Sequence, residues 1–314
     1  MRRGHELGLL AALAVASALL AFLSPQFLTT ANWVQILAGN SILLMLAEGM
    51  TLVIISGGID LSVGSALAVA STVAGAVAVR AGGNPVLVFA AALGIGLAMG
   101  GLNAFLISGL SIPPIVTTLA TLGIYRGLLL EITEGNWITN LPPRFLAIAQ
   151  RPLLGVPAVI VPGIAVAAGA HLLLTRLYAG RLLLQVGGHA ESARRAGVSL
   201  GRVRYAVYMA MGAIAGCAGV FYGSQLGSVQ GNAAVGLELS VVAAVVVGGT
   251  DIFGGRGSAI GTLLGVLLLG VIQNGLILAR VPTYWQQVVT GAFLLAGIVS
   301  AAVERRREER RFAL

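Results

Sequence analysis

The chain has 314 residues, of which 57% are hydrophobic and only 10% are charged, and its mean hydropathy is +0.95. A soluble domain carries about 25% charged residues, so this composition excludes an ordinary soluble protein and indicates a membrane protein. Apolar runs occupy almost the whole chain and leave no stretch for a second, soluble domain. We therefore expect a single transmembrane domain over residues 1–314.

All 19 basic residues are arginine, and the formal net charge is +8. A conventional P-loop ATPase needs a lysine on the β- and γ-phosphates, so any ATP hydrolysis linked to this chain must take place on another polypeptide. The arginines cluster in loops and at the termini, a pattern that orients membrane proteins and argues against a nucleic-acid partner. The single cysteine, Cys217, permits no intrachain disulfide, and the 3 histidines lack metal-ligand spacing, so no metal site is expected.

Ten apolar runs predict membrane-spanning helices, because about 20 apolar residues are needed to cross a bilayer. The first run, residues 7–23, follows two arginines as in a signal peptide. It is long for one and lacks a clean cleavage site, so we expect a retained helix. The other predicted spans are 34–56, 61–79, 86–109, 115–131, 156–177, 205–226, 238–250, 258–280 and 284–303.

The distribution of arginine predicts the orientation of the chain. With the N-terminus in the cytoplasm, fourteen arginines fall in cytoplasmic segments and four in external ones, while Arg126 lies within a span. Cytoplasmic segments of membrane proteins carry the excess of basic residues. Both termini are therefore expected in the cytoplasm, including a basic tail at residues 304–314.

A Gly-Gly-x-Asp sequence interrupts an apolar run twice. The glycines and aspartates of the two breaks are Gly57, Gly58 and Asp60, then Gly248, Gly249, Asp251, Gly254 and Gly255. Glycine-interrupted helices at corresponding places in two halves are typical of transporters, so we predict a degenerate internal repeat with hinges at the breaks. Each aspartate either caps the helix that follows it or contacts a solute. Their position toward the cytoplasmic end favours capping.

Hydrogen-bonding side chains deep within the spans are better candidates for a solute pathway. Amides both donate and accept, so they can replace the water that a polyhydroxylated solute loses, and a lone carboxylate at membrane depth rarely faces lipid. The candidates are Asn40, Ser41, Glu48, Asn103, Gln273 and Asn274. Hydrogen bonding between helices is the competing role.

Residues 178–204 form a predicted cytoplasmic loop with a short charged helix. Its small residues Ala190, Ala193 and Gly197 recur on one helical face. Its outward-facing charges are Glu191, Arg194 and Arg195. Such a charged knob fits docking into a cleft on an ATPase, and an ordinary positive-inside loop is the alternative.

The predicted external segment from Thr133 to Pro152 mixes aromatic residues and prolines with polar residues. It is either an interfacial loop with an aromatic anchor, Trp137, or a docking surface for an external partner. These two interpretations are compatible.

The sequence from Glu238 to Gly265, together with residues 57–65, resembles the permease subunits of ABC importers of the ribose, arabinose and xylose group. The resemblance covers roughly residues 32–291. It implies a monosaccharide permease of the bacterial inner membrane that works by alternating access. It also implies that the 178–204 loop couples the permease to an ATPase. Glu48 and His189 depart from the family pattern and leave the solute open.

The resemblance further implies partners: two ABC ATPase subunits that carry ATP and magnesium, a second permease copy or a paralogue, and a periplasmic or lipid-anchored sugar-binding protein. Membrane lipid surrounds the chain, which itself is expected to hold no cofactor and no catalytic residue.

Three other functions are weighed against this one. The solute of such an importer could equally be autoinducer 2 or another small polar molecule. An ion-coupled secondary transporter would need its own coupling site at the midplane, for which Glu48 alone is thin support. A membrane-embedded enzyme would need a His/Asp/Glu or Ser/His/Asp cluster, and the sequence offers none.

Overall fold

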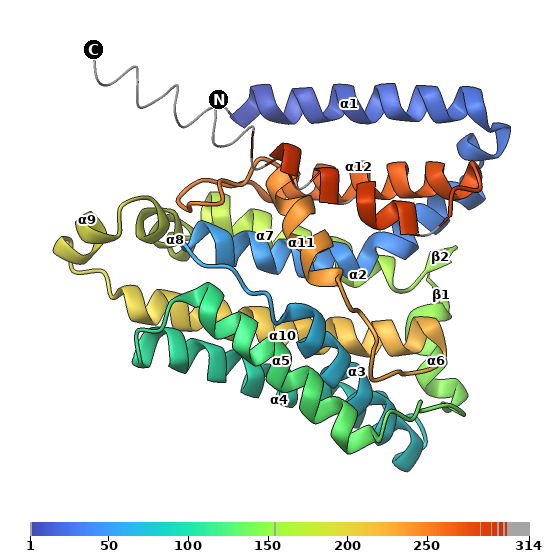
Figure 1. The fold of residues 1–314 in the computed structure, drawn as a ribbon, viewed down its shortest axis with the longest axis horizontal. Helices are drawn as coiled ribbons and strands as arrows, with labels where there is room; N and C mark the ends of the chain where they lie inside the picture. The colour runs from blue at the N-terminus through green and yellow to red at the C-terminus, as the bar shows by residue number, and fades with distance from the viewer. Residues whose placement is uncertain are drawn as a thin grey trace.

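The computed structural model describes residues 2–299 except 154, 283, 290, 294 and 298. It is a bundle of long helices with a small β-hairpin at one end (Figure 1). The longer helices are α1 (Arg2–Leu23), α2 (Thr30–Ile55), α3 (Val63–Arg80), α4 (Pro85–Ala104), α5 (Pro114–Thr133), α7 (Ile160–Arg176), α10 (Leu200–Leu226) and α12 (Ala259–Leu278). The shorter elements are η1 (Pro25–Leu28), η2 (Phe105–Gly109), α6 (Pro143–Gln150), β1 (Pro152–Leu153), β2 (Val156–Pro157), α8 (Tyr178–Gly188), α9 (Ala190–Arg195) and α11 (Leu237–Val247).

The bundle has two distinct ends. At one end lie α8 and α9, together with the first residues of α1; at the other lie α6 and the β1–β2 hairpin (Figure 1). We call these the α9 end and the α6 end. After α12, residues 284–289, 291–293 and 295–297 are again helical. The predicted basic tail at 304–314 lies outside the described residues.

Seven helices of the described part of the chain are long and apolar enough to cross a membrane, namely Gly4–Leu23, Thr30–Ile55, Val63–Arg80, Pro85–Gly109, Pro114–Thr133, Leu200–Leu226 and Ala259–Leu278. Helices α7 and α8 meet at 78° and add an eighth span if the bent pair is counted as one. An all-α polytopic membrane protein is therefore confirmed. The total of ten spans and the orientation of the termini stay predictions.

Helix α11 differs from the prediction of a complete span at 238–250. It has 11 residues, and at about 1.5 Å per residue it covers roughly half of a hydrocarbon core about 30 Å thick. The apolar run is real, but the helix begins inside the bundle rather than at its surface (Figure 1). The start of the helix lies within one residue of the prediction, but the helix ends at Val247, before the glycine break, and is too short for a complete span.

Helix α2 lies at the centre of the bundle. In its most apolar stretch 83% of the residues are buried, against 6% for α1 at the periphery. It packs against α7, α10, α11 and α12. A helix that is apolar on all sides is expected in such an enclosed position.

Helices α4 and α10 approach each other through glycine. A Cβ atom at Gly96 would strike the carbonyl oxygen of Gly212, and one at Gly100 would strike that of Tyr208. Small residues permit such close packing of membrane helices. The glycines of α4 therefore serve packing at these two positions.

Helices α2 and α11 end in the same way. Gly57 has φ +85° and Gly249 has φ +84°, in the left-handed region that glycine tolerates. The amide that follows each glycine donates to the carbonyl oxygen five residues earlier, at 3.1 Å for Gly58 and 3.2 Å for Thr250. This shared helix end supports the internal repeat. The left-handed glycine is the first of the motif in one break and the second in the other, so Asp60 and Asp251 do not occupy equivalent places.

Candidate functional site

A buried polar cluster surrounds Asp60, which is 3% exposed. The Ser62 amide and hydroxyl donate to Asp60 Oδ1 at 2.9 and 2.6 Å. The Asn103 amide donates to the Ser62 hydroxyl at 2.9 Å, and the Tyr125 hydroxyl lies 3.4 Å from Asn103 Oδ1. We call Asp60, Ser62, Asn103 and Tyr125 the Asp60 cluster. It joins the segment before α3 to α4 and α5, and it holds a carboxylate inside the bundle among hydrogen-bond donors, as a buried carboxylate requires.

The two aspartates of the breaks close turns rather than cap helices. The N-cap positions of α3 and α12 belong to Ser62 and Ser258. Asp60 accepts from the amide of Ser62, and Asp251 accepts from the amide of Phe253 at 3.0 Å. The capping prediction is therefore wrong for both residues, because each carboxylate bonds an amide of its own turn. Asp251 is also only half-buried at the α9 end, whereas Asp60 is enclosed.

The first turns of α3 and α11 face each other inside the bundle. A Cβ atom at Gly64 would strike the carboxylate of Glu238 and come within 2.9 Å of the Ala234 carbonyl oxygen. From here α3 leads toward the α6 end and α11 leads back toward the α9 end (Figure 1). We call this contact the α3–α11 junction. A carboxylate between two helix N-termini is favourably placed, because each N-terminus carries partial positive charge.

Arg126 of α5 fixes the segment that leads into α11. Its Nη1 atom donates to the carbonyl oxygens of Gly231 and Ala233, both at 2.7 Å. Glu238 lies close enough for its negative charge to act on the Arg126 guanidinium. This arrangement could not be predicted from the sequence. Its only signal was an arginine within a predicted span, and nothing in the sequence links that position to residues more than a hundred positions away.

Two of the predicted pathway residues, Asn40 and Asn274, lie on the seam between α2 and α12. Asn274 and Asn32 exchange hydrogen bonds at 2.9 and 3.1 Å, and the Asn40 side chain packs against Gly270. Farther along the seam, the hydroxyls of Thr51 and Thr262 are 2.6 Å apart. Asn40 and Asn274 thus make helix–helix contacts in this state, which was the competing role. They remain pathway candidates only if the seam opens.

Glu48 is the least satisfied of the predicted residues. It is 0% exposed on α2, and neither of its carboxylate oxygens has a hydrogen-bond partner among the described residues. A buried polar group without a partner calls for an explanation, and a solute or ion that arrives during transport is one. The pathway prediction for Glu48 stays open.

The remaining candidates are spread over the bundle. The Ser41 hydroxyl donates to the Leu37 carbonyl oxygen of its own helix at 2.7 Å, and Gln273 is half-buried on α12. The structure therefore joins Asn103 to the Asp60 cluster and places Asn40 and Asn274 on one seam. It does not gather the six predicted residues into one lining.

Three glycine segments meet at the α9 end. The amide of Gly255 donates to the carbonyl oxygen of Ile55 at 2.9 Å. A Cβ atom at Gly187 would strike the same carbonyl oxygen, and one at Gly254 would lie 3.0 Å from the Cα of Gly57. We call this contact the glycine junction. It ties both breaks to the end of α8, so the predicted hinges and the predicted coupling loop form one structural unit.

Helix α9 presents its charges outward as predicted. Glu191 pairs with Arg194 at 2.7 Å and with Arg195 at 3.2 Å, and all three side chains are more than half exposed. Ala193 is buried beneath them, His189 is exposed, and Gly197 ends the helix with φ +81°. The result is a small charged knob at the α9 end. No group of three or more metal-ligating side chains occurs in the part of the chain that the structure describes.

Membrane-length helices around an enclosed polar cluster define a multi-pass membrane protein, and its two glycine breaks are typical of transporters. A family model described as the permease component of branched-chain amino acid transport systems matches residues 32–298. The chain belongs to this family of ABC transporter permeases, and the resemblance to monosaccharide-type permeases is confirmed at that level. The protein is therefore a multi-pass protein of the bacterial inner membrane with a transport role.

Curated relatives are similar along nearly the whole chain. The autoinducer 2 import system permease protein of Enterobacter sp. (strain 638) is 36% identical over 298 residues, which is 95% of this chain and 86% of that protein. The protein of the same name from Shigella flexneri is 33% identical, over 100% of this chain and 93% of its own. That from Klebsiella pneumoniae is 35% identical, over 95% and 86% respectively. No solved structure matches the chain.

Proposed function

We propose that the chain is the membrane-spanning subunit of an ATP-driven importer whose solute is autoinducer 2 or a similar small polyhydroxylated molecule. The similarity to autoinducer 2 import permeases along 95–100% of the chain carries this proposal. A monosaccharide of pentose or hexose type is the nearest alternative, since it offers the same hydroxyl groups to a pathway of amides and hydroxyls.

The buried contacts suggest how the solute passes. Transport by alternating access needs an element with two arrangements. The α3–α11 junction is suited to this role, because the first turns of the two helices meet mainly at the Glu238 carboxylate. Arg126 restrains the segment before α11 but not α3. Separation of α3 from α11 would expose Glu238 and the neighbouring Asp60 cluster to a solute.

The glycine junction would carry the movement of an ATPase to this site. The end of α8, which leads into the α9 knob, contacts the end of α2 through Gly187 and Ile55. Beyond α2 the chain continues to Asp60. The proposed partners are two ATPase subunits at the knob, a second permease copy or a paralogue, and a periplasmic or lipid-anchored binding protein at the α6 end. ATP and magnesium belong to the ATPase subunits, and this chain needs no cofactor.

The solute is tested by uptake into proteoliposomes that contain the complete importer with its binding protein. We expect saturable, ATP-dependent uptake of labelled autoinducer 2, with weak competition by ribose and none by leucine. Preferred uptake of ribose would show that the solute is a monosaccharide rather than autoinducer 2. Preferred uptake of leucine would refute the polyhydroxylated solute.

The docking role of α9 is tested by exchanging its charges. R194E breaks one ion pair and E191R breaks both pairs of Glu191, and each variant reverses a surface charge. The double variant E191R/R194E restores the pair between positions 191 and 194 with reversed polarity. Exposed pairs of this kind contribute only about 0.3–0.5 kcal/mol, so all three variants should fold. If α9 docks on an ATPase, all three lose solute-stimulated ATP hydrolysis. Recovery in the double variant would show that the pair serves only the helix itself.

An ion-coupled secondary transporter remains the second candidate because of Glu48. A carboxylate that is enclosed and has no hydrogen-bond partner among the described residues is a common site of proton or cation coupling. Under the importer proposal, the E48Q variant still takes up solute when ATP is supplied, and an imposed proton gradient does not change that uptake. Loss of gradient-driven uptake in E48Q would favour the second candidate.

A further inference from the structure

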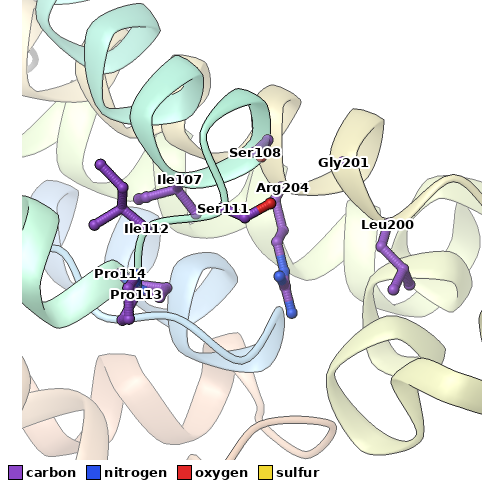
Figure 2. A pocket seen from close by; sticks show the side chains of 9 residues that line it. All are labelled: Ile107, Ser108, Ser111, Ile112, Pro113, Pro114, Leu200, Gly201 and Arg204. Atoms are coloured by element: carbon purple, nitrogen blue, oxygen red, sulfur yellow. The ribbon is translucent and has the colours of Figure 1, made fainter.

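A cavity of about 300 Å³ lies at the α9 end, outside the Asp60 cluster and the two junctions. It is bounded by the η2 turn, the segment that joins η2 to α5, and the first turns of α10. Figure 2 shows the Arg204 side chain extending into it, with Leu200 on one side and Pro113 and Pro114 on the other. Ser108 and Ser111 supply the other polar side chains of its wall.

Two polar atoms of this cavity lack partners within the described part of the chain. The Nε atom of Arg204 and the hydroxyl of Ser108 are buried and form no hydrogen bond there. No described carboxylate forms an ion pair with Arg204, and no acidic residue lines the cavity. Asp60, the acid that acts on the neighbouring Tyr208, is already bonded to Ser62. Arg204 as a whole is half-buried, but its enclosed Nε atom has no acceptor, and a buried donor without an acceptor is costly, so the cavity suits an anion with several oxygen atoms.

The surroundings favour an anion that belongs to the membrane. Large apolar side chains beside the cavity are exposed, among them Leu110 at 56% and Val116 at 57%. In a membrane protein such side chains face hydrocarbon. The exposed arginines of α9 and α10 lie at the same end of the bundle. A phosphate with acyl chains fits this combination of an arginine, two hydroxyls and an apolar rim, since basic pockets between membrane helices bind anionic headgroups.

We propose that Arg204, Ser108 and Ser111 bind the phosphate group of an anionic phospholipid. The guanidinium presents several N–H donors in a fork that matches phosphate oxygens, and the two hydroxyls add donors beside it. The acyl chains lie along the exposed apolar side chains next to the cavity. Lipid binding at this site does not depend on which solute is transported, so the lipid proposal is independent of the importer proposal.

The test measures thermal unfolding of the full-length chain in nanodiscs of phosphatidylcholine, with and without phosphatidylglycerol. Wild type should gain thermal stability from phosphatidylglycerol. R204Q should lose more than half of that gain, whereas R202Q, with the neighbouring exposed arginine replaced, should keep it. Native mass spectrometry should show fewer retained phosphatidylglycerol molecules on R204Q, which gives a second readout if the variant is less stable overall.

Three outcomes would overturn the proposal. One is an equal gain from phosphatidylglycerol in wild type and R204Q. Another is the same protection of wild type by millimolar inorganic phosphate in phosphatidylcholine discs, which would assign the cavity to free phosphate. The third is R204Q that retains phosphatidylglycerol but no longer binds an ATPase subunit, which would make the cavity a protein contact.

Discussion

At the residue scale, Asp60 and Asp251 show how one motif leads to two environments. Each carboxylate accepts a hydrogen bond from the backbone amide two residues later, at 2.9 Å for Asp60 and 3.0 Å for Asp251. Asp60 is enclosed and also accepts from the Ser62 hydroxyl, to which Asn103 donates in turn. Asp251 lies in the loop at the α9 end. Of the two aspartates, only Asp60 therefore belongs to the enclosed polar cluster.

We predict that D60A destabilises the protein more than D251A does. Removal of the Asp60 carboxylate leaves the Ser62 amide and hydroxyl buried without an acceptor, which costs about 1–3 kcal/mol. The half-buried Asp251 turn can be rehydrated, so the free energy of unfolding should change less. Denaturant titration in detergent micelles compares the two variants. Equal losses would contradict the enclosed Asp60 cluster.

At this scale, the sequence predicts which polar residues are buried better than it predicts their contacts. Asn103 was selected as a buried amide and does belong to the Asp60 cluster. The partners of Arg126 and Glu238 could not be predicted, because they are set by the path of residues 227–236 through the bundle. Asn40 and Asn274 were selected for the same reason as Asn103, and in this state they bond or pack within the α2–α12 seam.

At the element scale, the glycine junction joins three segments that are far apart in sequence. The carbonyl oxygen of Ile55 accepts from Gly255 and faces Gly187 without room for a side chain. Movement of α8 must therefore reach α2 directly.

We predict that G187A disrupts this contact and that G188A does not. A Cβ atom at position 187 would strike the Ile55 carbonyl oxygen and lie 2.7 Å from the Gly255 amide nitrogen, whereas one at position 188 would meet the Gly255 Cα at an ordinary 3.6 Å. Overpacking of this kind costs about 1–3 kcal/mol. G187A should lower the unfolding midpoint and the solute-stimulated ATPase rate of the assembled importer. Equal behaviour of the two variants would count against the junction.

Most helices could be predicted from hydropathy, and the exceptions have a physical reason. The runs at 34–56, 61–79 and 86–109 correspond closely to α2, α3 and the α4–η2 helix. The run at 238–250 holds only the 11-residue α11, because turns at residues 231–236 precede the helix and the Gly248–Gly249 break ends it. The run at 156–177 is part of a helix pair bent by 78°, and apolar composition does not record a bend.

At the scale of the whole molecule, the α9 end and the α6 end should lie on opposite sides of the membrane. Asn136 is exposed in the segment before α6, and Ser192 is exposed on α9. In a C217S background, a membrane-impermeant maleimide should label N136C in intact spheroplasts and S192C only after permeabilisation. The reverse pattern would invert the orientation predicted from the arginines.

Transport driven by an ATPase on another polypeptide is the central claim for the whole molecule. It rests on the permease family, on a chain without lysine, and on a charged knob joined to both helix breaks. The most direct test is solute uptake into proteoliposomes that contain the permease with and without its ATPase subunits. Uptake that requires both the ATPase subunits and ATP is the predicted result. Uptake by the permease alone, driven by an ion gradient, would contradict it.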